Sequence, residues 1–79
     1  MKVYAVYMHD HSGEDVVEVF STEANAKHYI QDDIREVTDI LMDDGYEVIE
    51  VIRSNCDFRV TAANGEIFYE WALFECTMR

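Results

Sequence analysis

The fold is decided by residues 21–45, which read STEANAKHYIQDDIREVTDILMDDG. Ser21 is a residue type that accepts a hydrogen bond from the unpaired amides of a first helical turn, and Glu23 places a carboxylate near the positive end of the helix. Gly45 can adopt the left-handed conformation that commonly ends a helix. The sequence therefore predicts one helix over residues 22–44.

Apolar residues recur through this segment at helical spacing. At about 100° per residue they fall on one stripe, which has to pack against the rest of the protein. The stripe consists of Ala26, Ile30, Ile34, Val37 and Leu41.

Segments rich in β-favouring residues flank the helix on both sides. We expect strands over residues 2–9 and 16–20 before it, and over 46–53, 58–62 and 66–77 after it. The polar residues 10–15 and 54–57 separate neighbouring strands, and Asn64-Gly65 indicates a hairpin because both residues tolerate the positive φ of a type I′ turn. The prediction is an α+β fold in ββαβββ order, with one long helix packed on one face of a single antiparallel sheet of four to five strands.

The chain has 79 residues, which leaves room for one hydrophobic core and predicts a single domain over residues 1–79. No apolar run approaches the roughly 18 residues that span a bilayer, so we do not expect a membrane protein. The two cysteines, Cys56 and Cys76, show no disulfide framework and follow no signal peptide. They are expected as packing residues in a cytoplasmic protein.

Charge is the strongest signal in the composition. Asp and Glu number 17 against 6 Lys and Arg, which gives a net charge of −11. Such a surface repels phosphates, so we expect no direct binding of nucleic acid, and it attracts basic protein surfaces. The alternative is that the acidity only keeps the protein soluble.

The carboxylates are concentrated on and after the helix, where residues 32–50 contain eight of them and the single base Arg35. Like charges three or four residues apart destabilise a helix by a few tenths of a kcal/mol per pair, which suggests a functional reason. A row of this kind can imitate phosphates and occupy a nucleic-acid groove on a basic protein; a solvated face without a partner is the alternative. The predicted binding residues on and after the helix are Asp32, Glu36, Asp39, Asp43, Asp44 and Glu47.

The sheet contains more aromatic residues than one helix can cover, so part of it is expected to face outward. We place Tyr69 and Trp71 of the last strand on this outward face, which is the kind of surface that marks an interface. The alternative function is accordingly a homodimeric or adaptor module that uses this face, unless loops fold back over it.

The sequence contains only weak motifs for metal binding or catalysis. His9-Asp10-His11 places two imidazoles on one side of a strand, but two ligands do not make a zinc site, and metal binding by His9 and His11 stays open. The chain has no glycine-rich phosphate loop and no nucleophile elbow, and its length leaves few residues for a catalytic pocket. We expect neither an enzyme nor a cofactor.

Three segments resemble small phage and prophage proteins: KVYAVY at 2–7, EVFSTE at 18–23 and AKHYI at 26–30. Some short acidic proteins of that origin are anti-CRISPR or anti-restriction proteins, which block a nuclease by occupying its DNA or guide-RNA surface. The resemblance covers about the first 30 residues. It implies a non-catalytic inhibitor of a CRISPR or restriction nuclease in the host cytoplasm, and it assigns no role to any single residue.

Overall fold

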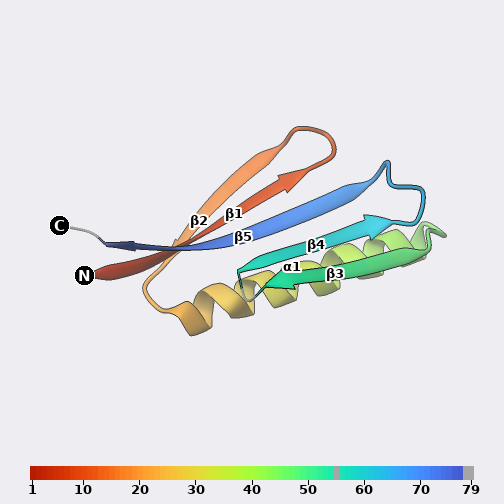
Figure 1. Cartoon of the computed structure of the whole chain (residues 1–79). Helices are drawn as coiled ribbons and strands as arrows, with labels where there is room; N and C mark the ends of the chain where they lie inside the picture. Colours follow the sequence, from red (N-terminus) through yellow and green to blue (C-terminus); the bar gives the residue numbers. More distant parts are fainter. Residues whose placement is uncertain (55, 78–79) are drawn as a thin grey trace.

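Five strands and one helix follow one another in ββαβββ order in the computed structural model, which describes residues 1–54 and 56–77 (Figure 1). The strands form one antiparallel sheet in the order β2-β1-β5-β4-β3. The predicted fold class is confirmed, with five strands. The elements are β1 (Lys2–Asp10), β2 (Asp15–Phe20), α1 (Glu23–Asp43), β3 (Val48–Ser54), β4 (Asp57–Ala62) and β5 (Phe68–Thr77).

The last strand occupies the centre of the sheet. β5 lies between β1 and β4, so it joins the hairpin β1–β2 to the hairpin β3–β4. Its ten residues are apolar at positions of both parities, which suits a strand with neighbours on both sides. β2 and β3 are left as the edge strands.

The helix begins and ends at local signals. Thr22, not the predicted Ser21, is the N-cap, and its Oγ1 accepts a hydrogen bond from the Asn25 amide at 3.2 Å. Gly45 has a φ of 87° and donates to the Met42 carbonyl at 3.0 Å, while Tyr46 donates to Leu41 at 3.0 Å. This pair of bonds is a Schellman motif, so the predicted stop at glycine is confirmed.

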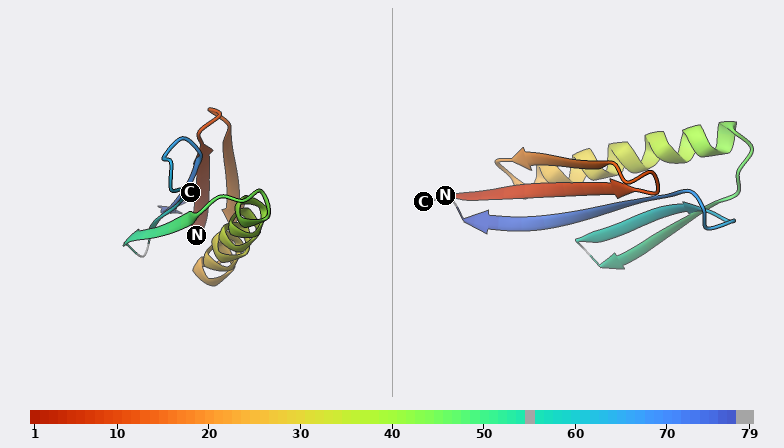
Figure 2. Two further views of the ribbon diagram at one scale, coloured as in Figure 1. Left: turned by 90° about the vertical axis from the view of Figure 1, so that its right-hand side faces the viewer. Right: turned by 90° about the horizontal axis from the view of Figure 1, so that it is seen from above.

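The core lies between α1 and one side of the sheet. Ala26, Ile30 and Leu41 of the predicted stripe are buried, and Ile34 and Val37 pack around them. The sheet side of this core consists mainly of Val6, Val60, Trp71 and Leu73. Figure 2 shows α1 on one side of the sheet only, so among the described elements no helix covers the opposite side.

The turn at Asn64-Gly65 differs from the prediction. Gly65 has a φ of 75°, but no described non-glycine residue has a positive φ, so a type I′ turn at Asn64 is wrong. Gly65 instead donates to the Ala62 carbonyl, and Ala62 donates to Ile67, both at 2.9 Å. The connection is longer than a two-residue loop, and longer loops are usually built around a type I turn with a left-handed glycine.

The turn predicted at residues 54–57 lies where the structure joins β3 to β4, although residue 55 itself is outside the described residues. The β3–β4 pairing is irregular between Ile52 and Ser54. Nowhere in residues 1–54 and 56–77 is there a helix long and apolar enough to cross a bilayer.

Candidate protein-binding site

The solvent side of α1 carries a row of four carboxylates, which we call the acidic face. All four side chains are exposed, on the side away from the buried residues of the stripe. Successive members are three or four residues apart, so they rise by roughly 4.5–6 Å along the helix axis. The face consists of Asp32, Glu36, Asp39 and Asp43.

Two further predicted residues continue this negative surface beyond the end of the helix. Asp44 is the C-cap of α1, and Glu47 lies in the short connection to β3; both are exposed. The Glu47 carbonyl accepts a hydrogen bond from the Ala63 amide at 2.8 Å, which anchors this connection to the β4–β5 turn. The structure therefore brings the six predicted acids into one stretch along and after the helix.

Among the bases whose side chains the structure describes, Lys2, Lys27, Arg35 and Arg59, none forms an ion pair with this stretch. Three of these bases form ion pairs elsewhere, with nitrogen–oxygen distances of 2.9 Å for Lys2 and Glu75, 2.8 Å for Lys27 and Glu23, and 2.8 Å for Arg59 and Glu70. Among the described side chains, none of the four carboxylates of the acidic face forms an ion pair. The acidic face therefore keeps its charge for solvent or for a partner.

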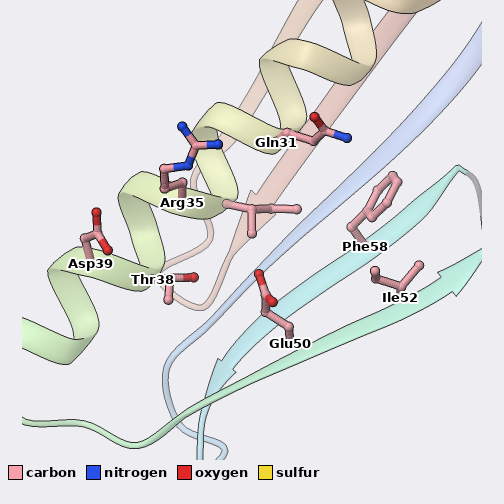
Figure 3. Close-up of a pocket in the computed structure, with 8 residues that line it drawn as sticks. Gln31, Arg35, Thr38, Asp39, Glu50, Ile52 and Phe58 are labelled. Atoms are coloured by element: carbon pink, nitrogen blue, oxygen red, sulfur yellow. The ribbon is translucent and has the colours of Figure 1, made fainter.

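A groove of about 400 Å³ runs beside the acidic face, between α1 and strands β3 and β4. Figure 3 shows Glu50 rising from β3 toward the helix, with Thr38 directed into the same space from α1. Thr38 Oγ1 is buried and has no hydrogen-bond partner among the described residues. The full lining is Gln31, Ile34, Arg35, Thr38, Asp39, Glu50, Ile52 and Phe58.

The lining of the groove combines apolar side chains with carboxylates. Ile52 is 73% exposed although it lies on the helix side of the sheet, because α1 does not reach over β3 at this point. The carboxylates of Asp39 and Glu50 stand near apolar surface, which suits a long cationic side chain with an apolar stem. Glu50 and Ile52 were not among the predicted binding residues, although the high density of acids from residue 32 to 50 was an available signal for Glu50.

The predicted outward face around Tyr69 and Trp71 is wrong. Trp71 is 1% exposed beneath α1, and its Nε1 donates to Asp33 Oδ2 at 3.3 Å. Tyr69 points to the same side of the sheet and is half-buried, stacked at 6.3 Å from the Trp71 ring. Burial, followed by the nearby Asp33 carboxylate, also raises the pKa of Tyr29 on this covered side. Neither predicted aromatic residue is an exposed anchor.

The histidine and cysteine candidates do not form a site. His9 Nδ1 lies 2.6 Å from Asp15 Oδ1, and His11 Nδ1 lies 3.3 Å from the Phe68 carbonyl oxygen. No group of three or more metal-ligating side chains occurs in the described ranges. Cys56 and Cys76 are both free and exposed, so the expectation that they are packing residues is wrong.

No protein-family model, no curated protein and no solved structure matches this chain.

Proposed function

We propose that this chain is a non-catalytic binding protein that docks the acidic face of α1 on a cationic protein surface and thereby excludes nucleic acid from it. The observation that carries the proposal is the row of four exposed carboxylates without an ion-pair partner among the described side chains. Asp44 and Glu47 extend the docking surface past the helix end.

The spacing of the charges supports imitation of a phosphate backbone. Phosphates follow one another every 3.4 Å along the axis of one DNA strand, and the acidic face has a carboxylate about every 5 Å along a rigid rod. A groove that binds a phosphate row through Lys and Arg can therefore accept this rod. Net charge of −11 adds long-range attraction to such a groove.

The groove beside the helix gives the docking surface a second component. Asp39 belongs both to the acidic face and to the lining of the groove, which Glu50 lines from β3. An arginine or lysine of the partner can lay its stem on Ile34 and Phe58 and place its charge between the carboxylates. The resemblance to anti-CRISPR and anti-restriction proteins makes a nucleic-acid-binding nuclease the first partner to examine.

The test begins with the immobilised chain and a bacterial lysate. At low salt the chain is expected to retain proteins that bind nucleic acid, and added duplex DNA is expected to elute them by competition. Retention is expected to fall steeply as salt rises, because exposed charges are screened within about 10 Å at 0.1 M. A retained protein is then purified, and its DNA binding is titrated with the chain.

The decisive variant reverses two charges in the middle of the acidic face, Glu36→Lys with Asp39→Lys. Its matched control reverses two exposed acids in hairpin loops, Glu14→Lys with Glu66→Lys, and so has the same net charge. The acidic-face variant is expected to lose retention of the partner at least about tenfold, whereas the control loses only the smaller long-range contribution. Equal retention by the two double variants would refute the assignment of the surface.

A further inference from the structure

The side of the sheet that faces away from α1, which we call the open face, is apolar over much of its area. Val17 and Val19 of β2 are each 60% exposed, Phe74 of β5 is 53% exposed and Ile49 of β3 is 46% exposed. The pairing registers place all four on the side opposite to Val6. Val17, Val19 and Phe74 lie in two neighbouring rows of the sheet, whereas Ile49 lies apart from them on the edge strand β3. Exposed apolar side chains gathered on one face can mark an interaction site.

Charges on the open face are arranged in a row across four strands. Asp15 Oδ1 lies 2.6 Å from His9 Nδ1, and the Arg59 guanidinium donates a hydrogen bond to Glu70 Oε1 at 2.8 Å. Because Asp15 pairs with His9, His9 with Glu70, and Glu70 with Arg59, the row alternates acid, imidazole, acid, base. Asp57 is the remaining carboxylate among the described strand residues of this face. With three carboxylates and one arginine among these described residues, the open face carries only a small part of the net charge of −11.

The two central strands of the open face are complementary in size as well. β1 and β5 place Ala5 beside Phe74 and Tyr7 beside Ala72, so at these two positions a small residue has a large neighbour. Consider a two-fold axis that relates two copies and runs parallel to the strands, midway between β1 and β5. It superimposes β1 of one copy on β5 of the other. A half-turn about that axis brings Ala5 over the partner's Phe74 and Tyr7 over the partner's Ala72. Large side chains then meet small ones across the interface.

We propose that two copies of this chain associate open face to open face, about a two-fold axis parallel to the strands between β1 and β5. The same half-turn sets Asp15 opposite the partner's Arg59 and His9 opposite the partner's Glu70. A two-fold axis along the charge row instead would set Asp15 on Asp15 and Arg59 on Arg59, which is repulsive. The charges of this row therefore favour the axis parallel to the strands over the axis along the row.

The area of the open face suits a weak dimer. Only β1, β2, β4 and β5 overlap about this axis. Strands spaced about 4.8 Å apart and rising about 3.3 Å per residue give these four a surface of roughly 500 Å² per copy. Two such faces bury at most about 1,000 Å², which is the size of a weak interface. Sheets pack in this way at about 10 Å with their strands within about 30° of each other. The dimer also leaves its two acidic faces on opposite outer sides, where each stays accessible.

The experiment is sedimentation and light scattering of the purified full chain over a range of concentrations and salt. The expected species has twice the 9.2 kDa mass of one chain. Salt is expected to strengthen this association, because it screens repulsion between two acidic chains while the apolar contact remains. This response is opposite to the one expected for docking through the acidic face, so either proposal can fail without the other. A chain that remains monomeric at millimolar concentration would overturn the dimer.

A matched pair of variants locates the interface. Phe74→Asp is expected to raise the dissociation constant of the dimer at least about tenfold, because it buries a charge against the partner. Ile40→Asp makes the same kind of change at an exposed apolar residue of α1, which is 51% exposed, and is expected to leave the dimer intact. A dimer that survives the first variant, or that is lost with the second, would place the interface elsewhere, for example at the edge of β3.

A mixing experiment tests the axis even if the single variants are less stable. Asp15→Lys and Arg59→Glu each place like charges across the proposed two-fold and are expected to weaken their own homodimers. In a mixture of the two variants, every such contact pairs opposite charges, so heterodimers are expected to form in preference to both homodimers. Any loss of stability within a variant chain is present both in its homodimer and in the heterodimer, so it does not change the preference between them. Heterodimers and homodimers in the proportions expected from random association would overturn the proposed axis.

Discussion

At the scale of single residues, the Asp10 carboxylate holds together the loop between β1 and β2. Its Oδ1 accepts hydrogen bonds from Ser12 Oγ at 2.5 Å, from the Ser12 amide at 2.9 Å and from the Glu14 amide at 3.2 Å. These bonds, the Ser12 hydroxyl foremost, hold the pKa of Asp10 below its ordinary value of 3.8. Since the folded-state pKa lies below the unfolded one, the ionised group stabilises the fold above pH 3.8. That contribution is lost as the pH falls through the lowered pKa.

Asp10→Asn is therefore expected to lower the free energy of unfolding at pH 7 and to reduce the loss of stability on acidification. Part of the acid sensitivity stays, because the Tyr7 hydroxyl and then His9 lower the pKa of Asp15. Urea denaturation followed by circular dichroism, at neutral pH and below pH 3.8, measures both effects. Asp32→Asn is the matched control on an exposed carboxylate and is expected to change little. Equal acid sensitivity in Asp10→Asn and the unmodified chain would contradict this assignment.

The side chain of Trp71 shows where residue-scale prediction from sequence stops. β5 is apolar at odd and even positions, with Trp71 and Leu73 in one set and Phe74 in the other. A shift of one residue in register exchanges the two faces of a strand, and nothing local decides between them. The pairing of Trp71 with Met8, 63 positions earlier in the chain, decides it. The predicted interface therefore fell on the covered side.

At the scale of elements, the helix was predictable because its signals are local. The stripe, the first-turn Glu23 and the terminal Gly45 lie within one segment, and only the N-cap moved by one residue, to Thr22. The five strands were also found, with boundaries that differ by one or two residues. Their spatial order was not predictable, because placing β5 between β1 and β4 depends on contacts between distant residues.

Gly45 is expected to be the most sensitive residue at the helix end. An added Cβ would meet no atom within 4 Å, so Gly45→Ala tests the backbone alone, at a φ of 87°. The left-handed conformation costs an L-residue roughly 1–2 kcal/mol, and we expect a loss of about 1 kcal/mol in the free energy of unfolding. Gly45→Asn is expected to lose less, since asparagine tolerates this conformation better. Equal stability of Gly45→Ala and the unmodified chain in urea denaturation would exclude the proposed cause.

At the scale of the whole molecule, the chain has two surfaces of opposite character. The acidic face concentrates uncompensated carboxylates on α1, while the open face pairs most of its charges and exposes Val17, Val19 and Phe74. The sequence predicted the first, because helical spacing fixes which residues share a side of a helix. It also predicted that part of the sheet stays uncovered, but it placed the wrong residues there, because strand parity and neighbours follow only from the assembled sheet.

The acidic face is expected to lower the stability of the folded chain. Asp32 and Glu36, and likewise Asp39 and Asp43, are like charges four residues apart, and each such pair destabilises a helix by about 0.2–0.5 kcal/mol. The double variant Glu36→Lys with Asp39→Lys turns both repulsive pairs into attractive ones, although it also places a like charge four residues after Arg35 and so loses part of the gain. It is expected to raise the free energy of unfolding by about 1 kcal/mol at low salt, and by less at high salt where the pairs are screened.

The loop control, Glu14→Lys with Glu66→Lys, changes net charge equally but creates no such pair, so its gain is expected to be smaller. Urea denaturation of all three chains at two salt concentrations measures this, at a protein concentration low enough to keep each monomeric. A loss of stability in the acidic-face variant would mean that these carboxylates support the fold, and it would remove the reason to treat them as kept for a partner.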